Sequence, residues 1–321
     1  MAAVLLPIPA NLKPWNGGGA KWALSNISET NGVITFDVGD AFVLKSISMD
    51  ETLNLGVGVS RTLTVTGNPD YVEYTLTWKS SDSRIATVDQ EGKVTGVGVG
   101  TCTVTATTEK GLTAACTVNV QELVQINSIA ELKALDEGSE ARLVLKDAHT
   151  LYVYNGDIYV SDGTGAIVLK GTGLSPERWD VLNGQVPGRL VYSNKMPQFE
   201  TIGAVSVTAV AGEEIAPREL TMDEVSEKDY ADYVVLRATT LTRDGGIFAL
   251  GADKTARLYN VFQIKGISVP KTIDGKYFDI TCIYGTDVLN NEVIDEIYLL
   301  SSPVEVEFHP ALEQLTLEKA S

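Results

Sequence analysis

Apolar side chains alternate with serine and threonine over a long stretch in the second quarter of the chain. Between Trp78 and Val120 the alternation has a period of two, and glycine separates one run from the next. A period of two places apolar side chains on one face of a strand and polar side chains on the other, which is typical of short antiparallel strands packed on a core. The pattern therefore predicts an all-β fold.

A tight hairpin is expected close to the N-terminus. Two strand-like runs flank Asn31-Gly32, a dipeptide that favours a two-residue hairpin turn. An isolated hairpin is only marginally stable in water. We therefore expect residues 1–40 either to dock on the next domain or to be the remnant of a domain further upstream.

The chain beyond residue 122 has the pattern of a small barrel. Short helices are expected over 129–135, where Ser128 and Glu131 form a capping box, and over 176–182. The strand-like runs between them include 141–147, 151–154 and a last strand over roughly 198–210. Five strands with a helix between the third and fourth match the oligonucleotide/oligosaccharide-binding barrel, the OB-fold.

The order of elements then repeats. Residues 217–225 stand where the first helix stood, and residues 233–241 stand where the first long strand stood. This spacing predicts a second OB-like barrel. The domains that we expect are an N-terminal hairpin segment at 1–40, a sandwich at 41–122, barrels at 123–212 and 213–308, and a tail at 309–321.

Several motifs in the alternating stretch resemble one known family. They are Trp78-Lys-Ser-Ser-Asp82, Ile85-Ala-Thr-Val-Asp89, Gly92-Lys-Val-Thr-Gly96 and Gly100-Thr-Cys-Thr-Val-Thr-Ala106. In this order they resemble the group-two bacterial immunoglobulin-like domain, over about Ser46 to Val120. The resemblance implies a small immunoglobulin-like β-sandwich that serves as a spacer or adhesion module in bacterial surface proteins, without catalytic residues.

Two weaker resemblances concern the flanking parts. The helix at 129–135 together with the run Tyr159–Ile167 resembles OB-fold modules in surface proteins of gut-dwelling bacteria. The hairpin at Asn31-Gly32 resembles the closing hairpin at the end of catalytic regions in some secreted bacterial metalloproteases. The second resemblance implies that the chain is the accessory C-terminal portion of a secreted hydrolase.

Charge narrows the classes of partner. The chain has 42 acidic and 25 basic residues, and its formal net charge is −17. This balance argues against nucleic acid and against an anionic membrane surface, because both attract basic faces. No apolar run is long enough to form a transmembrane helix, and the N-terminus lacks the basic region of a signal peptide. A location at the cell surface or outside the cell thus follows from the resemblance alone, with the export signal lying outside this sequence.

The cysteines are expected to be free. Cys102 and Cys116 flank a hairpin whose loop is Glu109-Lys110-Gly111. That loop places Val104 opposite Cys116, so Cys102 is diagonal to Cys116 and too distant for an easy bridge. We expect both thiols, and that of Cys282, in the core.

The sequence carries no recognisable catalytic constellation. Its two histidines are His149, which is expected at an exposed strand end, and His309 in the tail. No zinc-protease helix, paired-cysteine motif, phosphate-binding loop or serine-nucleophile elbow occurs. Asp157 and Asp162 lie on opposite faces of a strand and are expected as solvated turn residues. We expect no catalytic residue, no metal site and no cofactor, and hence not an enzyme.

Three aromatic side chains give the best candidate for binding. Tyr152, Tyr154 and Tyr159 lie on adjacent strands of the first barrel, and the first two share a face. OB-folds bind ligands on the face of strands two and three, where aromatic rings stack on sugars or bases. Packing within or beside the barrel core is the alternative for all three.

Three hypotheses for function remain open at this point. The first is a non-catalytic multi-domain surface or secreted protein that acts as a spacer or adhesion module and binds glycan or protein. The second is an accessory portion of a secreted hydrolase, either a protease or a glycoside hydrolase. The third, single-stranded nucleic-acid binding by the barrels, is disfavoured by the acidic charge. The sequence leaves the oligomeric state open.

Overall fold

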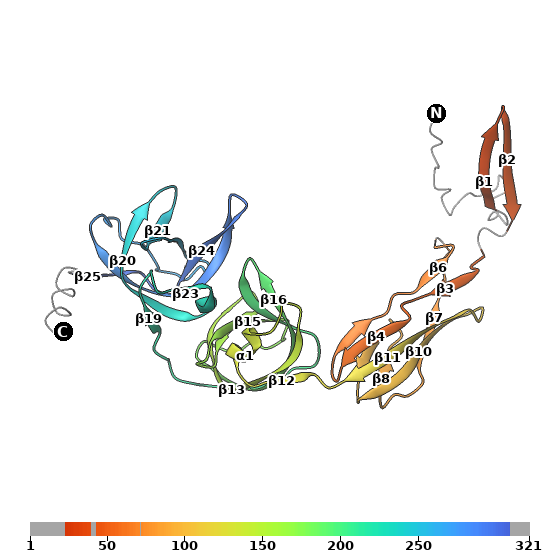
Figure 1. Cartoon of the computed structure of the whole chain (residues 1–321), viewed down its shortest axis with the longest axis horizontal. Helices are drawn as coiled ribbons and strands as arrows, with labels where there is room; N and C mark the ends of the chain where they lie inside the picture. Colours follow the sequence, from red (N-terminus) through yellow and green to blue (C-terminus); the bar gives the residue numbers. More distant parts are fainter. Residues whose placement is uncertain (1–22, 40–42, 71, 309–321) are drawn as a thin grey trace. The chain divides into compact units, whose positions relative to one another are not determined.

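Strands make up almost all of the regular structure. The computed structural model of the chain describes residues 23–39, 43–70 and 72–308. Within these residues there is one short α-helix and one 3-10 helix, and every other element is a strand. The all-β class is confirmed. The chain forms two compact units, Met1–Glu122 and Leu123–Ser321, and each is described separately (Figure 1).

The predicted N-terminal hairpin is present in the first unit. Strand β1 (Ala23–Thr30) pairs antiparallel with β2 (Val33–Gly39). The two turn residues Asn31 and Gly32 have φ angles of 54° and 79°. Two successive positive φ angles give the turn type whose twist matches that of the flanking strands, which is why this dipeptide closes the hairpin.

The rest of the first unit is the immunoglobulin-like sandwich. Its largest sheet has the order β4-β11-β10-β7, and β5-β9-β8 form a second sheet beside a short β3-β6 pair. The strand bounds are β3 Ser46–Ser48, β4 Thr52–Gly56, β5 Ser60–Thr62, β6 Thr66–Asn68, β7 Leu76–Ser80, β8 Ala86–Val88, β9 Lys93–Gly96, β10 Gly100–Thr108 and β11 Thr113–Gln121.

The register of β10 and β11 agrees with the register derived from the loop length. Val104 lies opposite Cys116, and Cys102 lies opposite Val118. Both cysteines are buried and free. Burial also raises the pKa of the Cys116 thiol above its ordinary value, since the thiolate is poorly solvated there. These two residues therefore serve as small apolar core residues.

The first barrel of the second unit is closed. Its sheet has the order β12-β13-β14-β15-β17-β16-β18, and β13 also pairs with β16. Strands β13, β14, β15, β17 and β16 thus form a complete ring. The bounds are β12 Val124–Ile126, α1 Ile129–Lys133, β13 Glu140–Tyr154, β14 Asp157–Ser161, β15 Ala166–Lys170, β16 Val181–Ser193, β17 Met196–Thr201 and β18 Ser206–Val210.

The second barrel has the same strand order. Its sheet runs β19-β20-β21-β22-β24-β23-β25, and β20 also pairs with β23. The bounds are β19 Arg218–Leu220, the 3-10 helix η1 Glu227–Asp229, β20 Tyr233–Arg243, β21 Ile247–Leu250, β22 Thr255–Tyr259, β23 Tyr277–Leu289, β24 Glu292–Leu299 and β25 Val304–Val306. The two closed five-stranded barrels are those that the repeated pattern predicts.

Both barrels use the same bulge to close. The register of β13 shifts between Leu145 and Ala148, with Asp147 at φ 51°, and that of β20 shifts before Thr239, with Ala238 at φ 44°. A bulge bends a strand and lets it pair with different neighbours at its two ends. In each barrel a side chain of the opposite strand accepts the bulge N–H: Asn183 Oδ1 from Asp147 at 2.9 Å, and Asp279 Oδ1 from Ala238 at 2.9 Å.

Several expected elements differ from those observed. The expected helix at 176–182 is absent, because Trp179 has a φ of 76° and its N–H donates to the Thr150 carbonyl at 2.7 Å. Residues 218–220, placed in an expected helix, form β19, which runs parallel to β20. The expected last strand at 198–210 is divided into β17 and β18.

The expected break between residues 147 and 151 is also wrong. Strand β13 continues through the bulge, so His149 lies within a strand, opposite Ser161 and Val181, and not at a strand end. His149 is half-buried. The expectation for His309 falls outside the described residues.

Candidate functional site

The three tyrosines predicted as a ligand platform lie against one ring of the second barrel. Tyr152 stacks on Phe262 with ring centroids 4.1 Å apart. Tyr154 and Tyr159 meet the same ring edge-on at 5.6 and 5.5 Å. Tyr159 is only 8% exposed, and burial raises its pKa. Ligand binding by these three side chains remains a prediction.

Phe262 links the cores of the two barrels. Its ring also meets Tyr298 of β24 at 5.7 Å, and one continuous apolar cluster contains buried residues of both barrels. Beside it, Gln263 Nε2 donates to the Tyr154 hydroxyl at 3.3 Å. Aromatic pairs of this kind contribute about 0.5–1.5 kcal/mol beyond the area that they bury. The face of β13 and β14 that carries the tyrosines is therefore an inter-barrel contact.

A second aromatic contact joins the barrels. Trp179, in the segment before β16, lies 5.3 Å from the ring of Tyr233 in β20. The Arg178 guanidinium is 4.3 Å from the centroid of the Trp179 ring, which is a cation–π geometry. Burial raises the pKa of Tyr233, which is 5% exposed.

A polar hollow lies beside this second contact. We call it the junction hollow, and its volume is about 410 Å³. The first barrel supplies one wall from β13 and from the turn between β14 and β15, and the second supplies the other from β19, η1 and the start of β20. Its lining residues are Leu151, Ser161, Gly163, Thr164, Gly165, Ile215, Ala216, Arg218, Lys228, Asp229, Asp232 and Tyr233.

An ion-pair network forms the second-barrel wall. Arg218 Nη2 bonds to Asp229 Oδ1 and, at 2.9 Å, to Asp232 Oδ2. Ser226 N donates to Asp229 Oδ2 at 2.6 Å, and Tyr233 N donates to Asp232 Oδ1 at 2.9 Å. Burial alone would lower the pKa of Arg218, but the two carboxylates outweigh it and the pKa is raised. Arg218 is therefore a fixed cation.

The turn between β14 and β15 is also held by hydrogen bonds. Asp162, expected as a solvated turn residue, is half-buried and accepts from Ile129 N at 2.7 Å and from Thr164 N at 2.9 Å. Ser161 Oγ donates to the Gly165 carbonyl at 2.9 Å. The turn is thereby fixed to the start of α1, and the rim of the junction hollow is preformed.

Little in the sequence indicates this site. Arg218 fell in an expected helix, and Phe262 fell in a segment without a strand pattern. One signal was available, since Ser226 and Asp229 have the spacing of a capping box, which is present at η1. The junction hollow otherwise depends on how two barrels pack, which local pattern does not encode.

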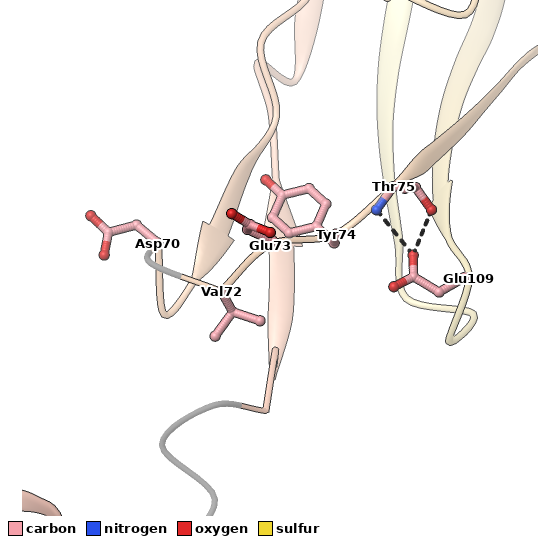
Figure 2. Close-up of a pocket in the computed structure, with 6 residues that line it drawn as sticks. All are labelled: Asp70, Val72, Glu73, Tyr74, Thr75 and Glu109. Atoms are coloured by element: carbon pink, nitrogen blue, oxygen red, sulfur yellow. Dashed lines mark hydrogen bonds between the residues drawn. The ribbon is translucent and has the colours of Figure 1, made fainter. Parts of the chain in front are cut away.

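A hollow in the immunoglobulin-like domain is less suited to a ligand. It is lined by Asp70, Val72, Glu73, Tyr74, Thr75 and Glu109. Figure 2 shows that its carboxylates do not converge: Glu109 turns to Thr75, and Asp70 points away. Glu109 Oε2 accepts from both the N–H and the hydroxyl of Thr75, at 3.1 and 3.0 Å. The hydrogen bond from its own backbone N–H, followed by those from Thr75, lowers the pKa of Glu109. These bonds give Glu109 a structural role.

Two further acidic residues, Asp157 and Asp295, have structural partners. Asp157 pairs with Lys170 at 3.1 Å. Asp295 accepts from the hydroxyls of Tyr230 and Tyr284, each at 2.6 Å. Within residues 23–39, 43–70 and 72–308, no group of three or more potential ligand side chains could hold a metal ion. In the same part of the chain, no helix is both long and apolar enough to cross a membrane.

Comparison with known proteins identifies one domain. Residues 43–118 match the family model of the bacterial Ig-like domain (group 2). The sandwich is therefore a member of that family.

Curated relatives share a short stretch with this chain. An uncharacterized protein of Clostridium acetobutylicum is 39% identical over 32% of this chain and 11% of its own length. Lacto-N-biosidase of Bifidobacterium bifidum is 46% identical over 22% of this chain and 6% of its own length. An alpha-L-arabinofuranosidase of Bifidobacterium longum is 53% identical over 16% and 5%. The matched stretch spans about a tenth or less of these three proteins.

Proposed function

We propose that this chain is a non-catalytic accessory part of an exported bacterial protein. The immunoglobulin-like domain acts as a spacer or adhesion unit, and the barrel pair carries the ligand contacts. The observation that carries this proposal is the group 2 bacterial Ig-like domain at residues 43–118. The cell surface or the extracellular space is the proposed location for the same reason.

Glycan is the proposed ligand class. Two of the relatives described above are named as glycan-acting enzymes, and the shared stretch is a small fraction of each. The formal charge of −17 disfavours nucleic acid, whose phosphates repel an acidic surface. The junction hollow, with charged and apolar walls, is within the size range of ligand sites.

The proposal is tested by retention of the full chain on immobilised glycans. We expect retention on at least one glycan and no shift of labelled single-stranded oligonucleotides at low salt. Oligonucleotide binding that weakens with salt would favour the nucleic-acid alternative, because counterion release makes such binding salt-dependent. Detection of the native protein in the cytosol of its source cell would contradict the proposed location.

The names of these relatives favour a second candidate, in which the chain is an accessory portion of a glycoside hydrolase. This candidate predicts that the gene encodes a catalytic domain in the same polypeptide. Sequencing of the surrounding gene decides the matter, since a reading frame without any catalytic domain eliminates this candidate.

A further inference from the structure

The junction hollow offers hydrogen-bond donors that the protein does not use. Arg218 directs Nε and Nη2 to Asp232 and Asp229. Its Nη1 makes no hydrogen bond to any residue that the structure describes. The Lys228 ammonium group likewise has no ion-pair partner among the described residues, although the Lys228 carbonyl accepts from Lys133 Nζ at 2.8 Å. Both cationic groups can therefore donate to a ligand.

A donor and an acceptor lie on the same wall. The Nε–Nη2 edge of Arg218 faces Asp232 Oδ2, at 3.3 and 2.9 Å, so the free Nη1 lies on the opposite side of the guanidinium group. The Asp232 carboxylate still has unused lone pairs. A ligand with several hydroxyl groups, each of which can donate and accept, complements this donor and this acceptor. Ile215, which is half-buried, supplies apolar surface in the same hollow for C–H groups.

The charge of the hollow indicates a neutral ligand. Its charged lining residues are two cations, Arg218 and Lys228, and two anions, Asp229 and Asp232. These charges cancel, in a chain whose net charge is −17. An anionic ligand would be repelled by the carboxylates and by the whole protein, and a cationic ligand by Arg218.

We infer that the junction hollow binds one sugar unit of a neutral glycan, with Arg218 Nη1 and the Asp232 carboxylate each bonded to a hydroxyl group. This inference rests on the proposed glycan-binding function and names the site for it. The site needs both barrels, because the turn at 161–165 and the network around Arg218 form opposite walls. It is separate from the face that carries Tyr152 and Tyr154.

The experiment uses the full chain and three variants. Native gels containing arabinan, arabinogalactan or a neutral glucan identify a polysaccharide that retards the wild type, and calorimetry with oligosaccharides from it gives dissociation constants. Arg218→Gln removes the proposed donor, and Ala216→Trp fills the exposed mouth of the hollow without removing a charge. Arg237→Gln is the matched control, because Arg237 is similarly exposed (43% against 47%) and also pairs with two carboxylates, those of Glu219 and Asp279.

We expect Arg218→Gln and Ala216→Trp each to weaken binding about tenfold or more, and Arg237→Gln to leave it within about twofold. A hydrogen bond to a charged group is worth about tenfold or more in affinity. Circular dichroism checks folding. If Arg218→Gln is unfolded, Ala216→Trp decides the outcome alone.

The unfavourable outcomes are distinguishable. Wild-type binding that a folded Ala216→Trp variant retains in full overturns the junction site but leaves glycan binding intact. Retardation by an acidic polysaccharide alone, such as pectate, overturns the neutral ligand class but not glycan binding. Absence of wild-type retardation in every gel overturns both this inference and the proposed glycan function.

Discussion

On the surface of the first unit, the ion pair between Asp82 and Arg84 sets the pKa of the Asp82 carboxyl group. Side-chain and backbone hydrogen bonds from Arg84 lower the pKa of Asp82 to about 2, from an ordinary value of 3.8. The lowered pKa means that folded protein holds the ionised form more firmly than unfolded protein does. The pair therefore stabilises the fold above about pH 3.8, and this contribution is lost as the pH falls through about 2.

We expect Arg84→Gln to raise the pKa of Asp82 toward 3.8, because two of its hydrogen bonds, at 3.1 and 2.8 Å, come from the guanidinium group. An NMR titration of the Asp82 carboxyl carbon measures the shift. The backbone N–H of residue 84 still donates to Asp82, so the return is incomplete. An unchanged pKa in the variant would show that the ion pair does not form in solution.

One glycine in the sandwich has no room for a side chain. Gly92 has a φ of +81°, and a Cβ atom there would lie 2.6 Å from Trp78 Cζ2. Gly92→Ala combines backbone strain with overpacking, so we expect it to lower the free energy of unfolding by roughly 3 kcal/mol. The control is Gly111→Ala, at φ +83° with open space around the position. We expect Gly111→Ala to lower the free energy of unfolding by only the backbone strain, about 1 kcal/mol.

Urea denaturation of both variants measures this difference. Equal losses of stability would mean that Trp78 moves aside at little cost, and the close packing of Trp78 on Gly92 would then contribute nothing specific.

At the scale of elements, the loop that carries Phe262 joins the barrels. Phe262 is 5% exposed and contacts the rings of Tyr152, Tyr154 and Tyr159. Truncation of a buried phenylalanine costs about 3–5 kcal/mol. We expect Phe262→Ala to destabilise Leu123–Ser321 by this amount and to uncouple the two barrels, so that calorimetry resolves an additional transition.

Tyr259→Ala is the control, since Tyr259 is 58% exposed and lies outside the apolar cluster that joins the barrels. A Phe262→Ala variant as stable as the wild type would contradict the role of this residue as the link between the barrels.

The elements that could be predicted from the sequence are those whose pattern is local. The alternation of apolar and polar residues predicts strands β10 and β11. The length of the loop between them predicts the register, in which Val104 lies opposite Cys116. The bulge in β13 was missed because Asp147 at the break reads as a turn residue. The local pattern of segment 176–182 predicts a helix. The hydrogen bond from Trp179 to Thr150, which holds the segment beside β13 instead, is long-range and cannot be read from that pattern. The junction hollow was missed for the same reason, since its walls come from two barrels.

At the scale of the whole molecule, the two units have separate cores. Val104 is fully buried in the sandwich, and the clusters around Phe262 and around Leu143 lie in Leu123–Ser321. A compact unit with its own core unfolds as a cooperative transition of its own. The chain is therefore expected to show at least two calorimetric transitions, of which one belongs to the first unit.

Val104→Ala assigns that transition. The substitution leaves a cavity in the first unit and costs roughly 2–3 kcal/mol, which lowers the midpoint of a domain of this size by on the order of 10 °C. The transitions of Leu123–Ser321 should not move, because no core residue of that unit is altered. Scanning calorimetry of wild type and variant measures both. If every transition shifted together, the two units would unfold as one cooperative unit. The first unit would then not be a spacer that folds independently of the barrels.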